Sequence, residues 1–343
     1  MAKKVSRLFL LLGALAITIL LVACQPEVQI AESATDFPIL SGPYLGQEPP
    51  GDAPKLFAPG VISTGMSERD VAIMPDGNEI YFCVNLGASG TILVTRQVSG
   101  RWTEPEVVSF ADNNLHFEPC LSHDGQKMFF LSTRPAPGDE EAGDQDIWAV
   151  EREGGDWGEP YNLGPPVCSD APEFFPSVTR DGTIYFTRRE NGAHAIYRSR
   201  FAYGLYQEPE RLPDQVNCGS TQYNAFISPD EGYIIVPVFG REDSLGGTDY
   251  YVVFRSDDDV WSEPINLGES INSAEGREWS PYVSPDGRYF FFMSSRSVFD
   301  AEDAAIPRTF GEMRRLHGEP RNGNSDIWWV SASVIERLRP EGY

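Results

Sequence analysis

A short turn motif recurs along this chain at intervals that few architectures can accommodate. Its clearest copy is Ser-Pro-Asp-Gly at residues 284–287, followed by an aromatic run at 289–292. Proline presets φ in a tight turn, aspartate caps the backbone that follows, and glycine tolerates positive φ. Five such turns are centred on aspartates spaced 48, 57, 49 and 56 residues apart: Asp76, Asp124, Asp181, Asp230 and Asp286. This period is typical of a β-propeller or a solenoid.

Each repeat contains four strand-like segments. In the second repeat these are residues 117–122, 127–132, 146–151 and 157–163. The last segment begins with an aromatic-x-Glu-Pro element, which also occurs at residues 102–105, 206–209 and 261–264. Proline is tolerated on an edge strand, where a missing N–H donor costs little. Units of this length with four strands fit the blades of a propeller.

The fifth repeat lacks an outer strand, because the chain has five turns but only four aromatic-x-Glu-Pro elements. A segment of suitable composition lies upstream of the first turn, at residues 54–62. Pairing the two would close a ring and cover strand edges that a linear array leaves open. We therefore predict an all-β fold over residues 55–343, a five-bladed β-propeller of four-stranded antiparallel blades whose last blade is completed by the N-terminal strand. Six blades are the alternative.

The N-terminus has the pattern of a secretion signal. Residues 1–7 are basic, residues 8–20 are apolar, and Leu-Val-Ala-Cys at 21–24 resembles the lipobox of bacterial lipoproteins. The resemblance implies a signal peptide at 1–23 and a lipidated Cys24, which would attach the protein to a membrane. An uncleaved anchor helix is the alternative. Residues 24–54 are expected to form a flexible tether. Gln25 favours the periplasmic face of the outer membrane in a host with two membranes, and otherwise the cell surface.

Charge and cysteine content exclude several classes of function. The chain has 51 acidic and 27 basic residues, a net charge of −24, which argues against nucleic acid as a partner. Cys168 and Cys218 precede consecutive repeats and could form a disulfide, whereas Cys83 and Cys120 are expected to be core thiols. No cofactor motif or metal-ligand spacing is present, so we predict neither a cofactor nor a metal. The acidic loop at 138–146 leaves calcium as an alternative.

The repeats resemble the TolB-like, WD-repeat-like propellers of bacterial envelopes. Their pattern, Glu-x-x-Pro before Ser-Pro-Asp-Gly and a later Asp-Ile-Trp, matches residues 278–287 and 326–328. The fourth repeat departs from it at Glu231 and at residues 224–225. The resemblance covers nearly all of the chain after the tether. TolB itself has six blades and an added domain, whereas this chain shows five units and no second domain, so the role of TolB does not transfer. We expect a binding or scaffolding module of the bacterial envelope, with an envelope protein or a glycan as its partner.

Alignment on the turn aspartates points to candidate ligand-binding residues at the start of the innermost strands. The position eight residues upstream is polar in all five repeats: Glu68, His116, Glu173, Gln222 and Glu278. The next position carries aromatic residues in four repeats, including Phe174, Tyr223 and Trp279. We predict that these residues ring one mouth of the central channel, where carboxylates and aromatic rings suit a sugar or a cation.

A catalytic role is the competing hypothesis. Five-bladed propellers include arabinanase-like glycosidases, in which carboxylates converge on the axis, and Glu68, Glu173 and Glu278 are candidates for general acid and base. The same acids could instead cap the starts of strands, since they recur with the repeat. A non-enzymatic binding module is therefore the preferred interpretation, and a carbohydrate hydrolase is the alternative.

Overall fold

The computed structural model describes residues 37–135, 138, 143–274, 277–300 and 305–343. Nearly all of them belong to one compact unit, Ile39–Tyr343. The predicted signal peptide and the lipidation site at Cys24 lie outside the described residues. None of the described helices is long and apolar enough to cross a membrane.

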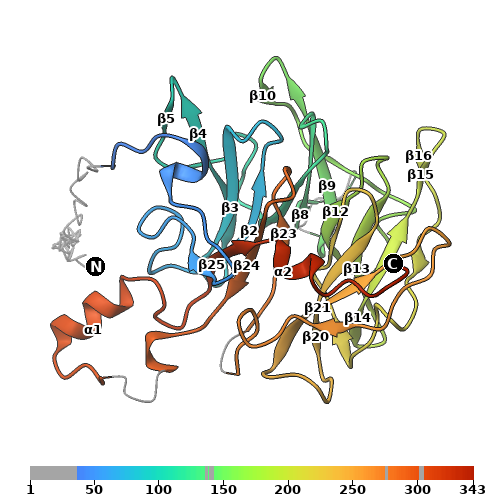
Figure 1. Ribbon diagram of the computed structural model, residues 1–343. Helices are drawn as coiled ribbons and strands as arrows, with labels where there is room; N and C mark the ends of the chain where they lie inside the picture. Colours follow the sequence, from blue (N-terminus) through green and yellow to red (C-terminus); the bar gives the residue numbers. More distant parts are fainter. Residues whose placement is uncertain (1–36, 136–137, 139–142, 275–276, 301–304) are drawn as a thin grey trace, which may run out of the picture. The chain divides into compact units, whose positions relative to one another are not determined.

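The unit is a five-bladed β-propeller of antiparallel sheets, as predicted (Figure 1). The first blade is built from β2 (Glu68–Ile73), β3 (Glu79–Asn85) and β4 (Gly90–Val98), with β5 (Arg101–Trp102) and β6 (Glu106–Val107) both pairing with β4. The second blade is built from β7 (His116–Leu121), β8 (Lys127–Ser132) and β9 (Asp146–Glu153), with β10 (Asp156–Trp157) and β11 (Tyr161–Asn162) both pairing with β9.

The third blade follows the same order, and a small hairpin extends from it. Its strands are β12 (Glu173–Val178), β13 (Ile184–Glu190), β14 (Ala193–Ser199) and β17 (Glu210–Arg211), and the hairpin is formed by β15 (Phe201–Ala202) and β16 (Leu205–Tyr206). In the fourth blade the innermost strand is split into β18 (Thr221–Gln222) and β19 (Phe226–Ile227), which precede β20 (Tyr233–Phe239), β21 (Thr248–Phe254) and β22 (Ile265–Asn266).

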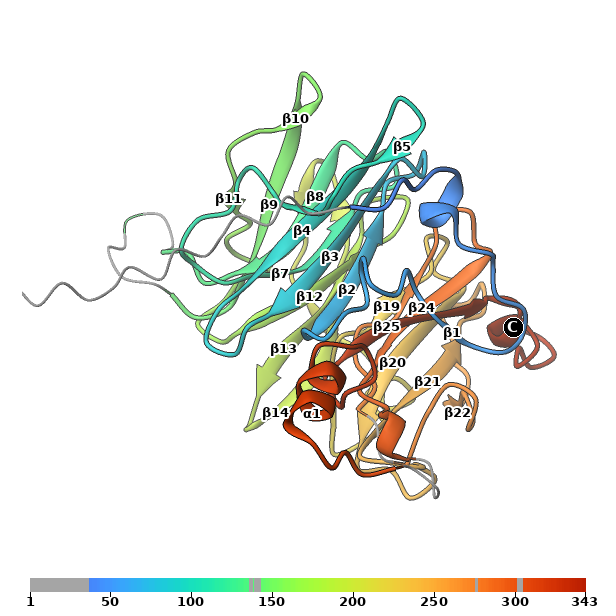
Figure 2. The ribbon, with the colours of Figure 1, turned by 90° about the vertical axis from the view of Figure 1, so that its left-hand side faces the viewer.

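The fifth blade closes the ring. Its strands are β23 (Tyr282–Val283), β24 (Tyr289–Ser294), β25 (Asp326–Ser331) and, from the other end of the chain, β1 (Lys55–Leu56). In β1, Lys55 pairs with Trp329 and Leu56 with Trp328, so the N-terminal strand supplies the missing outer strand (Figure 2). The helical elements are η1 (Pro43–Gly46), η2 (Val298–Asp300), α1 (Phe310–His317) and α2 (Ser333–Glu336).

The repeated turns have the structural role that their composition predicts. In the fifth blade, Ser284 Oγ donates to Asp286 Oδ1 at 2.6 Å, and the same oxygen accepts from the backbone N–H of Arg288 at 3.1 Å. The backbone N–H of Gly287, at φ +71°, donates to the carbonyl oxygen of Ser284. Each turn therefore links the innermost strand of a blade to the second strand. We call the side of the ring that carries these five turns the turn face, and the opposite side the loop face.

Residues 39–54, which lie in the predicted tether, belong to the compact unit. Leu45 is buried in the cluster that joins the fifth and first blades. The indole Nε1–H of Trp102 donates to the carbonyl oxygen of Gly42 at 2.8 Å, and the backbone N–H of Trp102 donates to that of Leu40 at 3.0 Å. The compact unit therefore begins at Ile39 rather than at Lys55.

Candidate functional site

The polar residues eight positions before the turn aspartates do not face open solvent. Glu68, Glu173 and Glu278 are 0% exposed. The hydroxyl of Thr64 donates to Glu68, and Ser273 Oγ donates to Glu278 Oε1 at 2.8 Å. Each acid thus binds a hydroxyl group from the loop that enters its own blade.

The remaining three residues of this set, Glu173, His116 and Gln222, are also held by contacts with neighbouring residues. Glu173 accepts the backbone N–H of Ser169 at 3.0 Å, and Arg188 Nε–H at 2.6 Å. His116 Nε2 lies 2.9 Å from Asp112 Oδ1. Gln222 Oε1 accepts the backbone N–H of Gly219 in its entering loop at 3.2 Å, and its amide also donates to the carbonyl oxygen of His194 in β14 at 2.7 Å. The structure therefore places all five residues in clasps that hold the entering loops.

Burial shifts the pKa of these clasp residues in the direction that disfavours charge. It raises the pKa of Glu278 to about 7, although hydroxyl groups of Ser273 and Ser294 oppose the shift. It raises the pKa of Glu68 and Glu173 and lowers that of His116. Glu278 Oε2 has no hydrogen-bond partner among the described residues. A carboxyl group that lacks both water and a full set of hydrogen bonds is less stable in its charged form than in its protonated form.

The aromatic residues that follow the clasps form a row across three blades. The rings of Phe174 and Tyr223 each approach the imidazole of His194 edge to face, with centroids 5.2 and 6.1 Å apart. Tyr223 in turn lies 6.3 Å from Trp279. All three are half-buried. The predicted aromatic residues therefore do come together, but the predicted acids lie beneath them in the clasps.

The next residue of each innermost strand has an unusual backbone conformation. These five residues, six positions before the turn aspartate, all have φ between 51° and 61°: Asp70, Glu118, Phe175, Asn224 and Ser280. Positive φ is uncommon for residues other than glycine. In the first three blades the strand register shifts at this point, which marks a β-bulge. Bulges redirect side chains, and in these three blades Asp70, Glu118 and Phe175 line the central cavity.

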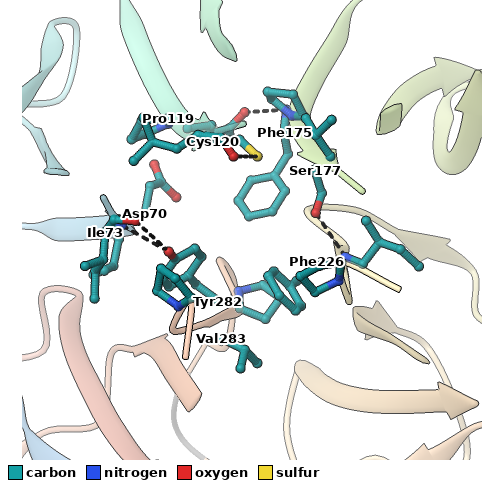
Figure 3. A pocket seen from close by; sticks show the side chains of 18 of the residues that line it. Asp70, Ile73, Pro119, Cys120, Phe175, Ser177, Phe226, Tyr282 and Val283 are labelled. Atoms are coloured by element: carbon teal, nitrogen blue, oxygen red, sulfur yellow. Dashed lines mark hydrogen bonds between the residues drawn. The ribbon is translucent and has the colours of Figure 1, made fainter. Parts of the chain in front are cut away.

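The channel contains a cavity of about 80 Å³ on the turn face. Its walls are mainly apolar and aromatic, and Phe175, Phe226, Tyr282 and Val283 contribute to them (Figure 3). Figure 3 shows the carboxylate of Asp70 pointing into the space between the inner strands. The phenol of Tyr282 is turned away to the backbone of Ile73, whose N–H it accepts at 3.0 Å. Its ring, rather than its hydroxyl group, is therefore offered to the cavity.

An ion-pair cluster forms the inner end of this cavity. Arg69 Nε lies 2.7 Å from Asp70 Oδ2, and Arg69 Nη2 donates to Glu118 Oε1 at 2.8 Å. Glu118 Oε2 also accepts the backbone N–H of Phe175 at 2.7 Å, which joins the second blade to the third. The hydroxyl group of Ser280 donates to Asp70, which joins the fifth blade to the first. The cluster thus braces the ring across the channel.

The cluster carries more negative than positive charge. Two carboxylates share one guanidinium, and Asp70 and Glu118 are 4% and 6% exposed. Burial raises the pKa of Glu118 to about 7, against the opposing effect of Arg69. Burial alone would lower the pKa of Arg69, but Asp70 and Glu118 raise it above its ordinary value. The cavity floor is therefore a buried site with an incompletely compensated carboxylate.

A second buried cluster has the composition of a metal site, but contacts within the protein account for the positions of its side chains. Single ligand atoms of Asp146, Cys168 and Glu173 lie within 4.8 Å of one another. Cys168 occupies the position that Asn217 and Asn272 fill in the next two blades, since each donates its backbone N–H to the carbonyl oxygen four residues earlier. The thiol bonds to the carbonyl oxygen of Ile147 at 3.5 Å. Arg188 already neutralises Glu173.

The four cysteines within the propeller are free thiols, so the disulfide between Cys168 and Cys218 does not form. The two residues are not equivalent, because Cys168 aligns with Asn217 rather than with Cys218. Cys83 is buried, as predicted, and burial raises the pKa of Cys120 to about 12. Residues 139–142 of the acidic loop considered for calcium lie outside the described residues.

No family model matches the chain, and no curated protein matches it. TolB from Acinetobacter baumannii is 17% identical with a TM-score of 0.46, over 78% of this chain and 57% of that one. An α-L-arabinofuranosidase from Lactobacillus brevis is 14% identical with a TM-score of 0.46, over 80% and 92%. The periplasmic gluconolactonase of Pseudomonas aeruginosa is 16% identical with a TM-score of 0.40, over 66% and 64%.

These likenesses assign no activity and no ligand to this chain. The chain spans 57% of the length of TolB, and 44% of a puromycin-hydrolysing peptidase from Mycobacterium tuberculosis that it also matches. The structure defines the class of protein, a five-bladed β-propeller. Its candidate site is the turn-face cavity.

Proposed function

We propose that this protein is a binding module of the bacterial envelope, in which the turn-face cavity takes a segment of a partner protein. One observation carries the proposal: the cavity combines apolar and aromatic walls with a carboxylate floor. Specific binding sites are concave, largely apolar and equipped with a few fixed polar groups. The module acts as a receptor or scaffold and performs no chemistry.

The floor selects the chemistry of the inserted group. Asp70 and Glu118 together exceed the charge of Arg69, so a cationic group entering the cavity would gain a carboxylate partner. The rings of Phe175, Phe226 and Tyr282 supply surfaces on which an ammonium or guanidinium group can rest. A lysine or arginine side chain of the partner, with its apolar stem, satisfies both requirements.

An exposed hairpin beside this face suits a protein partner better than a glycan. Tyr203 is fully exposed at the tip between β15 and β16, and Leu205 and Phe201 are 68% and 41% exposed. Exposed apolar groups beside an apolar cavity are characteristic of a protein-binding surface. The burial of Glu68, Glu173 and Glu278 disfavours the hydrolase alternative, because none of the three reaches solvent where a substrate could bind.

We further propose that the module is held at a membrane through a lipidated Cys24, after removal of residues 1–23. The lipobox at 21–24 is the support for this part of the proposal. The location would be the periplasmic face of the outer membrane, or the cell surface in a host with one membrane.

In vivo photo-crosslinking tests the binding site. A photoreactive side chain placed at His123, an exposed residue at the rim of the cavity, should give an adduct with one envelope protein. The adduct should disappear in the double variant Asp70→Asn, Glu118→Gln. A probe at Phe239, which is 48% exposed at the opposite end of β20, is the matched control. Equal adducts at both positions, or an adduct unaffected by the double variant, would refute the site.

A solution experiment tests the charge preference separately. Binding of n-butylammonium ions should shift the methyl resonances of Val283 and other cavity residues, whereas n-butanol, an uncharged molecule of similar size, should leave them in place. The two carboxylate substitutions should abolish the difference. Identical shifts with both probes would exclude a preference for a cationic group. A crosslinked partner would then have to insert an apolar side chain into the cavity.

A further inference from the structure

A long insertion distinguishes the fifth blade. Residues 295–325 connect β24 to β25 on the loop face and include α1 (Figure 1). The helix is well formed: Thr309 accepts the backbone N–H of Glu312, and the carboxylate of Glu312 accepts that of Thr309 at 3.0 Å, a capping box. No residue of α1 is buried, however. The helix is therefore held by its caps and its base rather than by an apolar face packed on the propeller.

The base of the insertion is fixed to the first blade. The side-chain amide of Asn322 donates to the carbonyl oxygens of Gly65 at 3.0 Å and His317 at 2.7 Å, and the amide of Asn324 also donates to Gly65 at 3.0 Å. A Cβ atom on Gly65 would lie 2.5 Å from the backbone of Gly318. This close approach means that the exposed helix is presented in a defined place.

The apolar residues of the insertion face outward. Ile306 and Phe310 are each 78% exposed, and Met313 is 50% exposed. Exposing three large apolar side chains to water within eight residues is unfavourable in free energy, and no contact with the described part of the chain offsets it. They therefore indicate a surface that is covered when the protein works.

The C-terminal part of the insertion has a charge opposite to that of the whole chain. Residues 305–321 contain four arginines and two glutamates, in a chain of net charge −24, although over residues 295–325 the five basic and five acidic side chains balance. Arg315 pairs with Glu319, whereas Arg308 and Arg314 have no ion-pair partner among the described residues. Both flank the exposed apolar side chains in sequence. We call Ile306, Arg308, Phe310, Met313 and Arg314 the insertion patch.

We propose that the insertion patch docks on an anionic membrane surface. An exposed segment that combines apolar side chains with arginines lacking an ion-pair partner among the described residues suits the boundary between lipid headgroups and acyl chains. Its positive charge complements anionic lipid, which the acidic remainder of the protein would avoid. A lipidated Cys24 would keep a membrane near, because the 13 positions from Cys24 to Phe37 span at most about 45 Å. Docking would direct the loop face to the membrane and leave the turn-face cavity open.

Hydrogen–deuterium exchange of the full-length acylated protein in vesicles tests this inference. With phosphatidylcholine and phosphatidylglycerol, amides of residues 305–317 should exchange more slowly than with phosphatidylcholine alone. The protection should be lost in Ile306→Asn, Phe310→Asn and reduced about fivefold by each of Arg308→Gln and Arg314→Gln. The double variant Tyr203→Asn, Leu205→Asn on the turn-face hairpin is the matched control and should retain it.

A second measurement guards against loss of helix in the variants. Tryptophan at position 310, from Phe310→Trp, should be quenched by brominated phosphatidylglycerol but not by the same lipid when Arg308 and Arg314 are both glutamine. Protection that is equal in the two lipid mixtures would overturn the proposal. So would protection that rises with protein concentration at fixed lipid, since that would identify a second copy as the occupant.

Discussion

The backbone N–H of Phe57 donates a 2.8 Å hydrogen bond to the carbonyl oxygen of Ile327, and this bond joins the beginning of the propeller to its end. The ring of Phe57 lies 5.0 Å from that of Phe291 and 5.2 Å from that of Trp329, edge to face. The side chain is 0% exposed. One aromatic residue therefore holds much of the packing at the seam.

Phe57→Ala should open this seam. Removing a fully buried phenylalanine costs about 3–5 kcal/mol, because it leaves a cavity as well as losing apolar burial. Thermal unfolding followed by near-ultraviolet circular dichroism should show a lower midpoint than wild type. Ile39→Ala is the control, since Ile39 is 79% exposed. Equal midpoints for the two variants would mean that the fifth blade is stable without β1.

Arg69→Met should destabilise the propeller by about 3–5 kcal/mol at neutral pH, because it leaves two buried carboxylates without their counter-charge. Urea unfolding would measure the loss. Adding Glu118→Gln should restore part of it, whereas Glu118→Gln alone should cost less than Arg69→Met. If the double variant is less stable than Arg69→Met, the negative charge is compensated by something other than Arg69.

Glu278→Gln should make stability less dependent on pH. Burial raises the pKa of Glu278 to about 7 from an ordinary 4.5, so the folded state binds the proton more tightly than the unfolded state. The stabilisation is complete below pH 4.5 and is lost as the pH rises to 7. At pH 7.5 the variant should melt about 2–4 °C above wild type, and near pH 5 the gain should vanish.

Glu118 and Asp326 have pKa values raised in the same direction and remain in the variant as an internal reference. A variant that melts below wild type at pH 7.5 would contradict the burial cost of the ionised carboxylate, and would mean that its hydrogen bonds with Ser273 and Ser294 outweigh that cost.

Gly65→Ala should displace the insertion without unfolding the propeller. A Cβ atom would meet the backbone of Gly318 at 2.5 Å, too close for either segment to stay in place. Trypsin should then cut faster after Arg314 and Arg315, while the melting temperature changes little. Gly51→Ala is a matched control, because no atom lies within 4 Å of its added Cβ. Unchanged cleavage would show that the contact with Gly65 does not position α1.

Cys24→Ala should release a folded, water-soluble propeller from the membrane fraction. The compact unit begins at Ile39, so no packing contact within it depends on Cys24. Fractionation and a melting curve would measure the two expectations. A protein that stays in the membrane fraction would favour an uncleaved anchor helix, and one that fails to fold would contradict the independence of the propeller.

The sequence alone predicted five blades and the closure of the ring, with six blades as the alternative, and the structure has five. Turn geometry depends on local residue types, so Ser284, Asp286 and Gly287 predict their turn without tertiary context. The missing outer strand of the fifth blade followed from counting the repeats. Periodicity could not show that residues 39–54 belong to the compact unit, because Leu45 and its neighbours are held by contacts with distant blades.

Only the tertiary structure decided which residues of the innermost strands reach the channel. The sequence places Glu173 and Phe175 two residues apart on one strand, which in a regular strand would put them on the same side. The left-handed residue at Phe175, with φ of 51°, breaks that alternation. Glu173 consequently turns to its entering loop, while Phe175 and its counterparts Asp70 and Glu118 line the cavity. A bulge changes the direction of a side chain without changing the composition of the strand, so the pattern of residues cannot reveal it.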